Sequence, residues 1–231
     1  MDFFLDGFRE GFVLLFGGDV ETWHAIGLSL WTSLLALTLG AALGVPVGTY
    51  VGLFRPRGAR LYAALFRAGT AFPTVVIGLL LYGLLCYRGP LAGLHILFTP
   101  WAVVIGQSLL ALPILASLSH AAAAGLDPRA VETVRTHGGS RFLALKLAVS
   151  ETRSTLVAAM LLAFGRCVTE LGIVLAVGGT ISGYTRTLPA QISLETSRGE
   201  FGRGLGSGFI LVLLACGAAL LAPVLARETK R

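Results

Sequence analysis

The feature that most constrains this chain is a series of long apolar runs, each of a length that suits a membrane crossing. A helix needs about 20 mainly apolar residues to cross the hydrocarbon core of a bilayer. We expect five spans, at residues 25–54, 61–87, 100–124, 154–177 and 209–226. Charged residues fill only 13% of the 231 positions, whereas a soluble domain carries about 25%. The sequence therefore predicts an all-α integral membrane protein with about five transmembrane helices, and residues 24–231 should form a single transmembrane domain.

The distribution of basic residues predicts how the chain is oriented. Most of the 18 Lys and Arg residues fall between the first and second spans, between the third and fourth, or after the fifth. These segments should be cytoplasmic, because cytoplasmic loops are enriched in Lys and Arg. The N-terminus is then outside and the C-terminus inside. The net charge of +6 is scattered among the apolar spans, which argues against a nucleic-acid partner.

Residues 1–23 precede the first span and do not resemble a secretory signal. The segment is acidic at its start, where a signal peptide would be basic. Phe4, Phe8 and Phe12 recur at helical spacing. This spacing predicts an amphipathic helix that lies in the membrane interface.

A stripe of glycines in the first span predicts close packing between helices. The stripe consists of Gly40, Gly44, Gly48 and Gly52. A glycine at every fourth position leaves one face of a helix flat, so that a second helix can approach its backbone.

The fourth span contains two opposite charges, Arg166 and Glu170. They are four residues apart and therefore share one face of the helix. Charges inside a bilayer are costly and normally face a bundle interior or a water-filled path. The pair has two interpretations at this point: it fixes helix packing by mutual neutralisation, or it lines or gates a translocation path.

A polar, glycine-broken segment lies between the third and fourth spans, at residues 127–139. Asp127 and Pro128 are typical of a helix start, and Gly138 is typical of a helix end. We expect a short cytoplasmic helix between them. Ala130, Val131 and Val134 would form its apolar face, whereas Glu132, Arg135 and His137 would point elsewhere. Such a helix is suited to docking another protein, although an ordinary interfacial loop is the alternative.

No catalytic or metal-binding pattern is visible in the sequence. The cysteines are far apart and lie in or beside apolar runs: Cys86, Cys167 and Cys216. No histidine has a carboxylate or a second histidine at ligand spacing. The chain also lacks a nucleophile elbow, a P-loop and an HExxH motif. We therefore expect no enzyme activity, no bound metal and no cofactor on this chain.

Several motifs resemble those of ABC importer permeases, in particular the permeases of tungstate importers. Glu132 with Gly138 six positions later is similar to the EAA-type motif of such permeases, although Thr133 and Val134 stand where that motif has two alanines. The resemblance continues in Phe72–Leu79 and in the segment VGGTISGYTRTLPAQISLETSRGEF at residues 177–201. Thr169-Glu170-Leu171-Gly172 resembles the Gly-Glu-x-Gly element of molybdate and sulfate permeases, with Thr for the first Gly.

The resemblance implies a type I ABC importer permease fold and a set of partners. Residues 127–139 would be the coupling helix, which docks into one of two ATP-binding cassette subunits, and Mg-ATP would be bound there. An extracytoplasmic oxyanion-binding protein would deliver the substrate. A second permease chain would complete the path as a homodimer in a bacterial or archaeal cell membrane.

The external segment before the last span is the candidate contact for the anion or its binding protein. Hydroxyls, backbone N–H groups and an arginine suit an oxyanion. The candidate residues are Thr180, Ser182, Tyr184, Thr185, Arg186 and Thr187. A solvated loop that only meets the binding protein is the alternative.

Tungstate is the expected cargo, with molybdate or sulfate as alternatives within the same class. An ion-coupled secondary transporter is the main alternative of another class. It would carry inverted repeats and ionisable groups at the midplane, and the sequence has no clear repeat. A membrane enzyme is the third possibility.

Overall fold

The computed structural model describes the backbone of residues 2–228. Within that range it describes all side chains except those of residues 2–6, 8, 15, 128, 130, 131, 135, 218, 219 and 221–228. The described residues form helices and turns without a strand. The prediction of an all-α protein is therefore confirmed.

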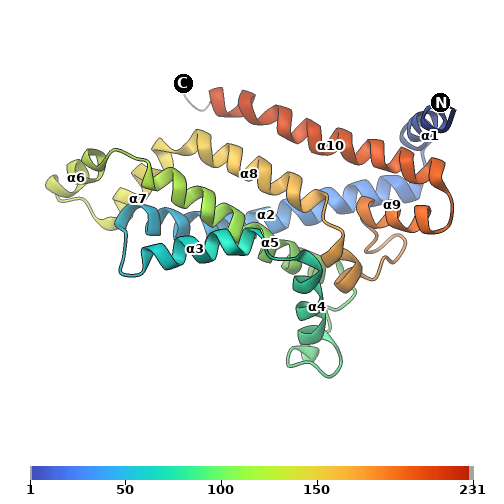
Figure 1. The fold of residues 1–231 in the computed structure, drawn as a ribbon, viewed down its shortest axis with the longest axis horizontal. Helices are drawn as coiled ribbons and strands as arrows, with labels where there is room; N and C mark the ends of the chain where they lie inside the picture. The colour runs from blue at the N-terminus through green and yellow to red at the C-terminus, as the bar shows by residue number, and fades with distance from the viewer. Residues whose placement is uncertain (1, 229–231) are drawn as a thin grey trace.

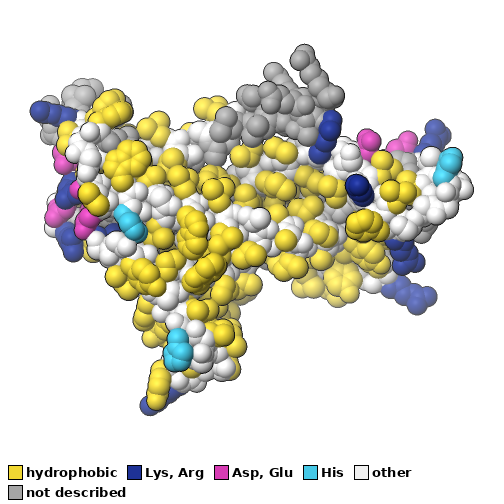
Figure 2. All heavy atoms as spheres, turned by 180° about the vertical axis from the view of Figure 1, so that it is seen from behind, with side chains coloured by type: hydrophobic (Ala, Val, Ile, Leu, Met, Phe, Trp, Pro, Cys, Tyr) yellow, Lys and Arg dark blue, Asp and Glu magenta, His cyan; other side chains and the backbone are white. Residues whose placement is uncertain are grey.

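Four helices run lengthwise and form the body of the protein (Figure 1). They are α2 (Val20–Phe54), α5 (Pro100–Ala124), α8 (Arg153–Val168) and α10 (Phe201–Glu228). The most extensive interface joins α2 to α5, and α8 packs against both α5 and α10. Figure 2 shows hydrophobic side chains over much of the visible face, between ends that carry charged side chains. This distribution matches a chain whose middle lies in hydrocarbon.

The contact between α2 and α5 depends on glycines that face the backbone of α5. A Cβ built on Gly44 would lie 2.8 Å from the carbonyl oxygen of Leu112, and one on Gly40 would lie 2.9 Å from the Cβ of Ala111. Gly48 lies in the same way against Ala116, and Gly52 against His120. Since real Cβ atoms do not approach other atoms so closely, no larger residue fits these positions without moving one of the helices.

The second expected span, residues 61–87, is not a continuous helix. It consists of α3 (Ala59–Thr70) and α4 (Thr74–Leu85), which are bent by 94°. Pro73 precedes α4, and a proline interrupts a helix because it has no N–H group and disfavours the helical conformation of the residue before it. As a result α4 projects sideways from the bundle (Figure 1).

The fourth expected span, residues 154–177, is also broken. Its helix α8 ends at Val168, and a π-helical turn, η2 (Val174–Gly178), follows. At its other end α8 meets α7 (Arg141–Glu151) at an angle of 72°. The segment expected as the fourth span is therefore a helix followed by a break and a π-helical turn.

The number of spans differs from the expected five within the described residues. Helices α2 and α5 are each long and apolar enough to cross a membrane, and each bent pair of helices adds one span if it is counted as a unit. The described apolar part of α10, Phe201–Gly217, is shorter than a full crossing. The count of five is thus not confirmed, whereas the expected boundaries of α5 match the structure.

The two ends of the long axis carry different elements. Helices α1 (Asp2–Phe16) and α9 (Leu188–Ser197) lie at one end, and α6 (Pro128–Thr136) lies at the other (Figure 1). Helix α1 packs against α10, where the backbones come close at Gly11 and Gly206. The N-terminal helix expected from the sequence is present. The side chains of Phe4 and Phe8 lie outside the described residues, so the amphipathic character of α1 stays a prediction.

Candidate functional site

The short helix α6 begins and ends where the sequence predicts, within one residue. The carboxylate Oδ1 of Asp127 accepts a hydrogen bond of 2.9 Å from the backbone N–H of Arg129. At the other end, Gly138 has a φ of 74°, and the N–H of Gly139 donates to the carbonyl oxygen of Val134 over 2.8 Å. Glycine adopts this left-handed conformation without the steric cost that a side chain would add. The chain therefore leaves α6 in a direction that depends on Gly138.

The described side chains on the outer surface of α6 are polar, and a small pocket lies beside them. Glu132 and His137 are exposed, and Val134 is half-buried. A pocket of about 300 Å³ lies between α6 and α7, and its lining includes Val134, His137 and Leu143. The side chains of Ala130, Val131 and Arg135 lie outside the described residues, so the full apolar face of the helix stays a prediction.

Arg166 and Glu170 form an ion pair at the end of α8. The guanidinium Nη1 lies 2.9 Å from the carboxylate Oε2, and Glu170 is buried whereas the Arg166 side chain is 45% exposed. The other carboxylate oxygen of Glu170 accepts a hydrogen bond of 3.1 Å from the backbone N–H of Ile173. Glu170 thus caps the next helical turn as well as pairing with Arg166.

Gly172 lies where α4 meets the segment that follows α8. A Cβ on Gly172 would be 2.8 Å from the Cγ2 of Val75, and one on Gly78 would be 2.8 Å from the Cβ of Ala176. The two glycines therefore allow α4 to pack directly on the chain break. The break also contacts α5, where the amide Nε2 of the buried Gln107 donates to the carbonyl oxygen of Cys167 over 3.0 Å. Gln107 was not predicted as a site residue. An amide in an apolar span is nevertheless a signal for a hydrogen bond between helices.

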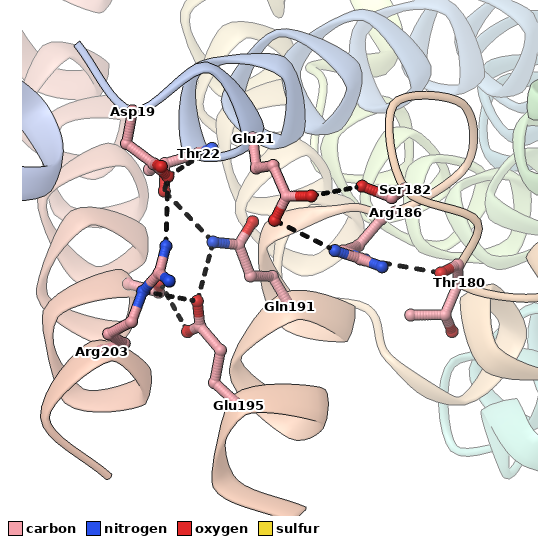
Figure 3. A network of polar contacts seen from close by, with 10 residues as sticks. Asp19, Glu21, Thr22, Thr180, Ser182, Arg186, Gln191, Glu195 and Arg203 are labelled. Carbon is pink, nitrogen blue, oxygen red and sulfur yellow. Dashed lines mark hydrogen bonds and ion pairs between the residues drawn. The ribbon is translucent and has the colours of Figure 1, made fainter. Parts of the chain in front are cut away.

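At the end of the molecule that carries α9, Arg186 is paired with Glu21 of α2 (Figure 3). The guanidinium Nη1 lies 3.5 Å from the carboxylate Oε2 of Glu21, and its Nε donates to the carbonyl oxygen of Thr180 over 3.4 Å. Ser182 donates to the same Glu21 carboxylate over 2.7 Å. The cationic side chain expected to face an anion therefore already has a carboxylate partner.

The other candidates in this segment divide into buried and exposed side chains. Thr185 and Thr187 are buried, whereas Tyr184 is 47% exposed. The hydroxyl of Thr185 donates to the carbonyl oxygen of Gly178 and accepts from the N–H of Ile181. Thr185 thus holds the loop together, and Tyr184 is available on the surface.

A second polar network beside Arg186 was missed from the sequence (Figure 3). Glu195 of α9 is buried and accepts hydrogen bonds of 3.0 Å from Gln191 and from Ser207 of α10. Gln191 also donates to Thr22 of α2, and Arg203 of α10 lies 3.5 Å from Asp19. The network ties α9 to α2 and α10. The spacing of Gln191 and Glu195 by four residues was its signal in the sequence.

The paired arrangement predicts that Arg186 and Glu21 act as a unit. We expect Arg186→Gln and Glu21→Gln to lower the melting temperature equally, and the double variant to lower it no further. The Glu21 side chain is 56% exposed and that of Arg186 only 12%. Solvent screens a pair with one exposed partner, and exposed pairs contribute about 0.2–1 kcal/mol, so we expect a shift of a few degrees. The measurement is a thermal melt of the purified variants in detergent. Arg198→Gln is the control, because Arg198 is exposed and has no ion pair among the described residues.

The same variants distinguish the two roles considered for Arg186. If Arg186 contacts a transported anion directly, Arg186→Gln should impair uptake while Glu21→Gln, which frees the guanidinium, should not. Equal uptake in both variants and in the unchanged protein would exclude the direct contact.

A comparison with protein families shows to which family the chain belongs. Residues 44–231 match the family of binding-protein-dependent transport system inner membrane components. The chain belongs to this family. It is therefore a membrane component of a transport system, and the relatives described below are likewise permease proteins.

Several curated relatives match over most of their length. The tungstate uptake system permease protein of Campylobacter jejuni is 34% identical over 215 residues, which cover 93% of this chain and 90% of the relative. A probable anion ABC transporter permease protein of Haloferax volcanii is 35% identical, over 88% and 91% of the two chains. The molybdenum transport system permease protein of Mycobacterium bovis is 34% identical over 180 residues, which cover 74% and 67%.

A solved structure confirms the type of fold. The MetNI methionine ABC transporter in an inward-facing conformation matches with a TM-score of 0.70 at 18% identity, over 90% of this chain and 95% of that one. The expected fold of a type I ABC importer permease is thus confirmed. Within the described residues, no group of three or more His, Cys, Asp or Glu side chains is placed to hold a metal ion.

Proposed function

We propose that this chain is the membrane-spanning permease subunit of an ATP-driven importer for an oxyanion, with tungstate as the first candidate. The observation that carries the proposal is the match to tungstate permeases along almost the whole chain. Molybdate is the second candidate, because molybdenum permeases match a shorter part of it. The chain itself hydrolyses no ATP, and hydrolysis takes place on a separate subunit.

The proposed mechanism assigns the two ends of the molecule to different partners. An external binding protein delivers the oxyanion at the end that carries α9. Two ATP-binding cassette subunits bind at the other end, where α6 docks into one of them. Closure of the ATPases on ATP moves α6 and switches the bundle between outward and inward access. A second copy of the chain completes the path, because one bundle of this size encloses no gated channel.

The proposed orientation follows the charge distribution. The N-terminus is external, the C-terminus is cytoplasmic, and the protein lies in a bacterial or archaeal cell membrane. Figure 2 shows basic side chains at the end of the molecule where α6 and α7 lie, which supports this orientation.

We assign the path or its gate to the break after α8, with Arg166, Glu170 and Gly172 as its residues. Its support is the position of an ion pair with a buried carboxylate beside an interrupted helix, since membrane proteins place such charges at functional sites.

Glu170→Gln should lower uptake by about tenfold or more, because it removes the buried charge. Arg166→Lys should retain uptake, because it keeps a cation beside the Glu170 carboxylate. Uptake is measured in proteoliposomes. If the Glu170→Gln variant takes up the anion at an unchanged rate, the pair is not part of the gate.

Reconstitution with the partners tests the assignment of function. The chain, its ATPase and its binding protein are placed in proteoliposomes, and ATP hydrolysis is measured. We expect hydrolysis to rise with binding protein loaded with tungstate, and to rise less with molybdate or sulfate. Failure of any ATPase to associate with the chain would contradict the proposal.

A further inference from the structure

A pocket of about 830 Å³ lies between the end of α2, the start of α3 and the end of α5. Its lining includes Arg55, Arg60, Arg67 and His120, and no acidic residue. The start of α3, which lines it, lies toward the end of the molecule that carries α6, away from α9 (Figure 1). None of the transport roles assigned above uses it.

The guanidinium groups of the pocket have no carboxylate partner among the described residues. The arginines that form ion pairs in the described part of the chain are Arg166, Arg186 and Arg203, and none of them lines the pocket. Arg67 donates from Nε to the carbonyl oxygen of Ala63 over 3.2 Å, which leaves its terminal nitrogens available. All three arginines are exposed, so solvent screens their mutual repulsion, and an anion between them would lower it further.

The end of α2 places the Arg55 side chain at the pocket. Arg55 ends α2 in a left-handed conformation, with φ 44° and ψ 57°. Glycine is the favoured residue at such a position, and another side chain there is strained. The conformation ends the helix here, and the N–H of Arg55 donates to the carbonyl oxygen of Val51 over 3.2 Å.

Helix α3 places charged and apolar side chains next to each other. Arg60 and Arg67 are seven residues apart, so they share a face with the buried Ala63, and all three line the pocket. Leu61 and Leu65 on the same helix are 62% and 56% exposed. A ligand with a charged head and an apolar tail fits this combination.

We propose that this pocket binds a tetrahedral oxyanion group, carried by the headgroup of an anionic phospholipid or free in solution. The planar, five-donor guanidinium groups match phosphate oxygens in bidentate geometry, and the N–H of His120 adds a further donor. Leu61 and Leu65 lie on another face of α3 and do not line the pocket. They are exposed, which favours the phospholipid, since its acyl chains would cover them. Basic pockets between membrane helices are known to bind anionic headgroups. The inference goes beyond the proposed transport function and does not depend on it.

The test is native mass spectrometry of the full-length chain titrated with dioleoylphosphatidylglycerol, and with dioleoylphosphatidylcholine for comparison. Each Arg→Gln change at positions 55, 60 and 67 should weaken phosphatidylglycerol binding about fivefold, and the triple variant about a hundredfold. Arg57→Gln is the matched control, because Arg57 is in the same loop but does not line the pocket. The triple Arg→Lys variant retains the charge but not the bidentate geometry, so it should recover only part of the binding.

A second arm separates the two sources of the oxyanion. Thermal melts of the same variants are recorded with sodium phosphate and with sodium tungstate. Stabilisation by either salt that is lost in the triple Arg→Gln variant, without selective lipid binding, assigns the pocket to a free anion. Arg60→Gln alone, at an exposed position, keeps the test valid if the triple variant fails to fold. Equal lipid binding and equal salt response in the unchanged protein, the Arg60→Gln variant and the Arg57→Gln control would overturn the proposal.

Discussion

Replacing Gly48 with leucine should prevent most of the protein from accumulating in a folded form. A Cβ at Gly48 would lie 2.9 Å from both the Cα and the carbonyl carbon of Ala116, which are backbone atoms that cannot rotate away. Overpacking a core typically costs about 1–3 kcal/mol, and a clash with backbone lies at the upper end. For a chain of this size, we expect the melting temperature to fall by about 10 °C. Size-exclusion chromatography and thermal melts of the purified variant measure the effect.

Gly27→Leu is the matched control for this prediction. Gly27 is on the same helix, and nothing lies within 4 Å of a Cβ built on it. The control should therefore melt close to the unchanged protein. A Gly48→Leu variant that accumulates and melts like Gly27→Leu would contradict the close packing of α2 on α5.

Replacing Gly138 with valine should uncouple transport from ATP hydrolysis while the protein still folds and inserts. Valine at a φ of 74° is strained, so the exit from α6 must change direction. Nothing lies within 4 Å of a Cβ at Gly138, so the effect on packing should be small. We expect ATP-driven uptake to fall by about tenfold or more, which is within the usual range of coupling energies. Glu132→Ala should act in the same direction, because Glu132 is exposed on the proposed docking surface.

Gly125→Ala is the control, because Gly125 precedes α6 with an ordinary helical φ of −86°. It should transport normally. Uptake and ATP hydrolysis are measured in the same proteoliposomes. If both rates in Gly138→Val and Glu132→Ala equal those of the unchanged protein, the docking role of α6 is refuted.

The parts of the fold that the sequence predicted well depend on neighbouring residues. The bounds of α5 follow from one unbroken apolar run, and α6 follows from Asp127, Pro128 and Gly138 at its two ends. Such signals lie within a few residues of the structure they specify. The same is true of the pairing of Arg166 with Glu170, four residues apart on one helix.

The parts that the sequence did not predict depend on residues far apart in the chain. Hydropathy along residues 61–87 is continuous, and a proline alone does not predict the 94° bend at Pro73, because Pro46 and Pro113 lie inside unbroken helices. The bend is possible because Gly172, about a hundred positions later, lets α4 pack on the break after α8. The partner of Arg186 is Glu21, 165 positions away. From its own neighbourhood, Arg186 looked free to bind an anion, and only the folded chain supplies the carboxylate.

The most direct test of the central claim is the accumulation of tungstate inside proteoliposomes that contain this chain, its ATPase and its binding protein. Tungsten in the vesicles is measured by elemental mass spectrometry, with ATP supplied on the side of the ATPase and no ion gradient imposed. The account predicts accumulation that requires both ATP and the loaded binding protein. Tungstate uptake that follows an ion gradient without ATP, or no uptake of tungstate, molybdate or sulfate under any of these conditions, would contradict it.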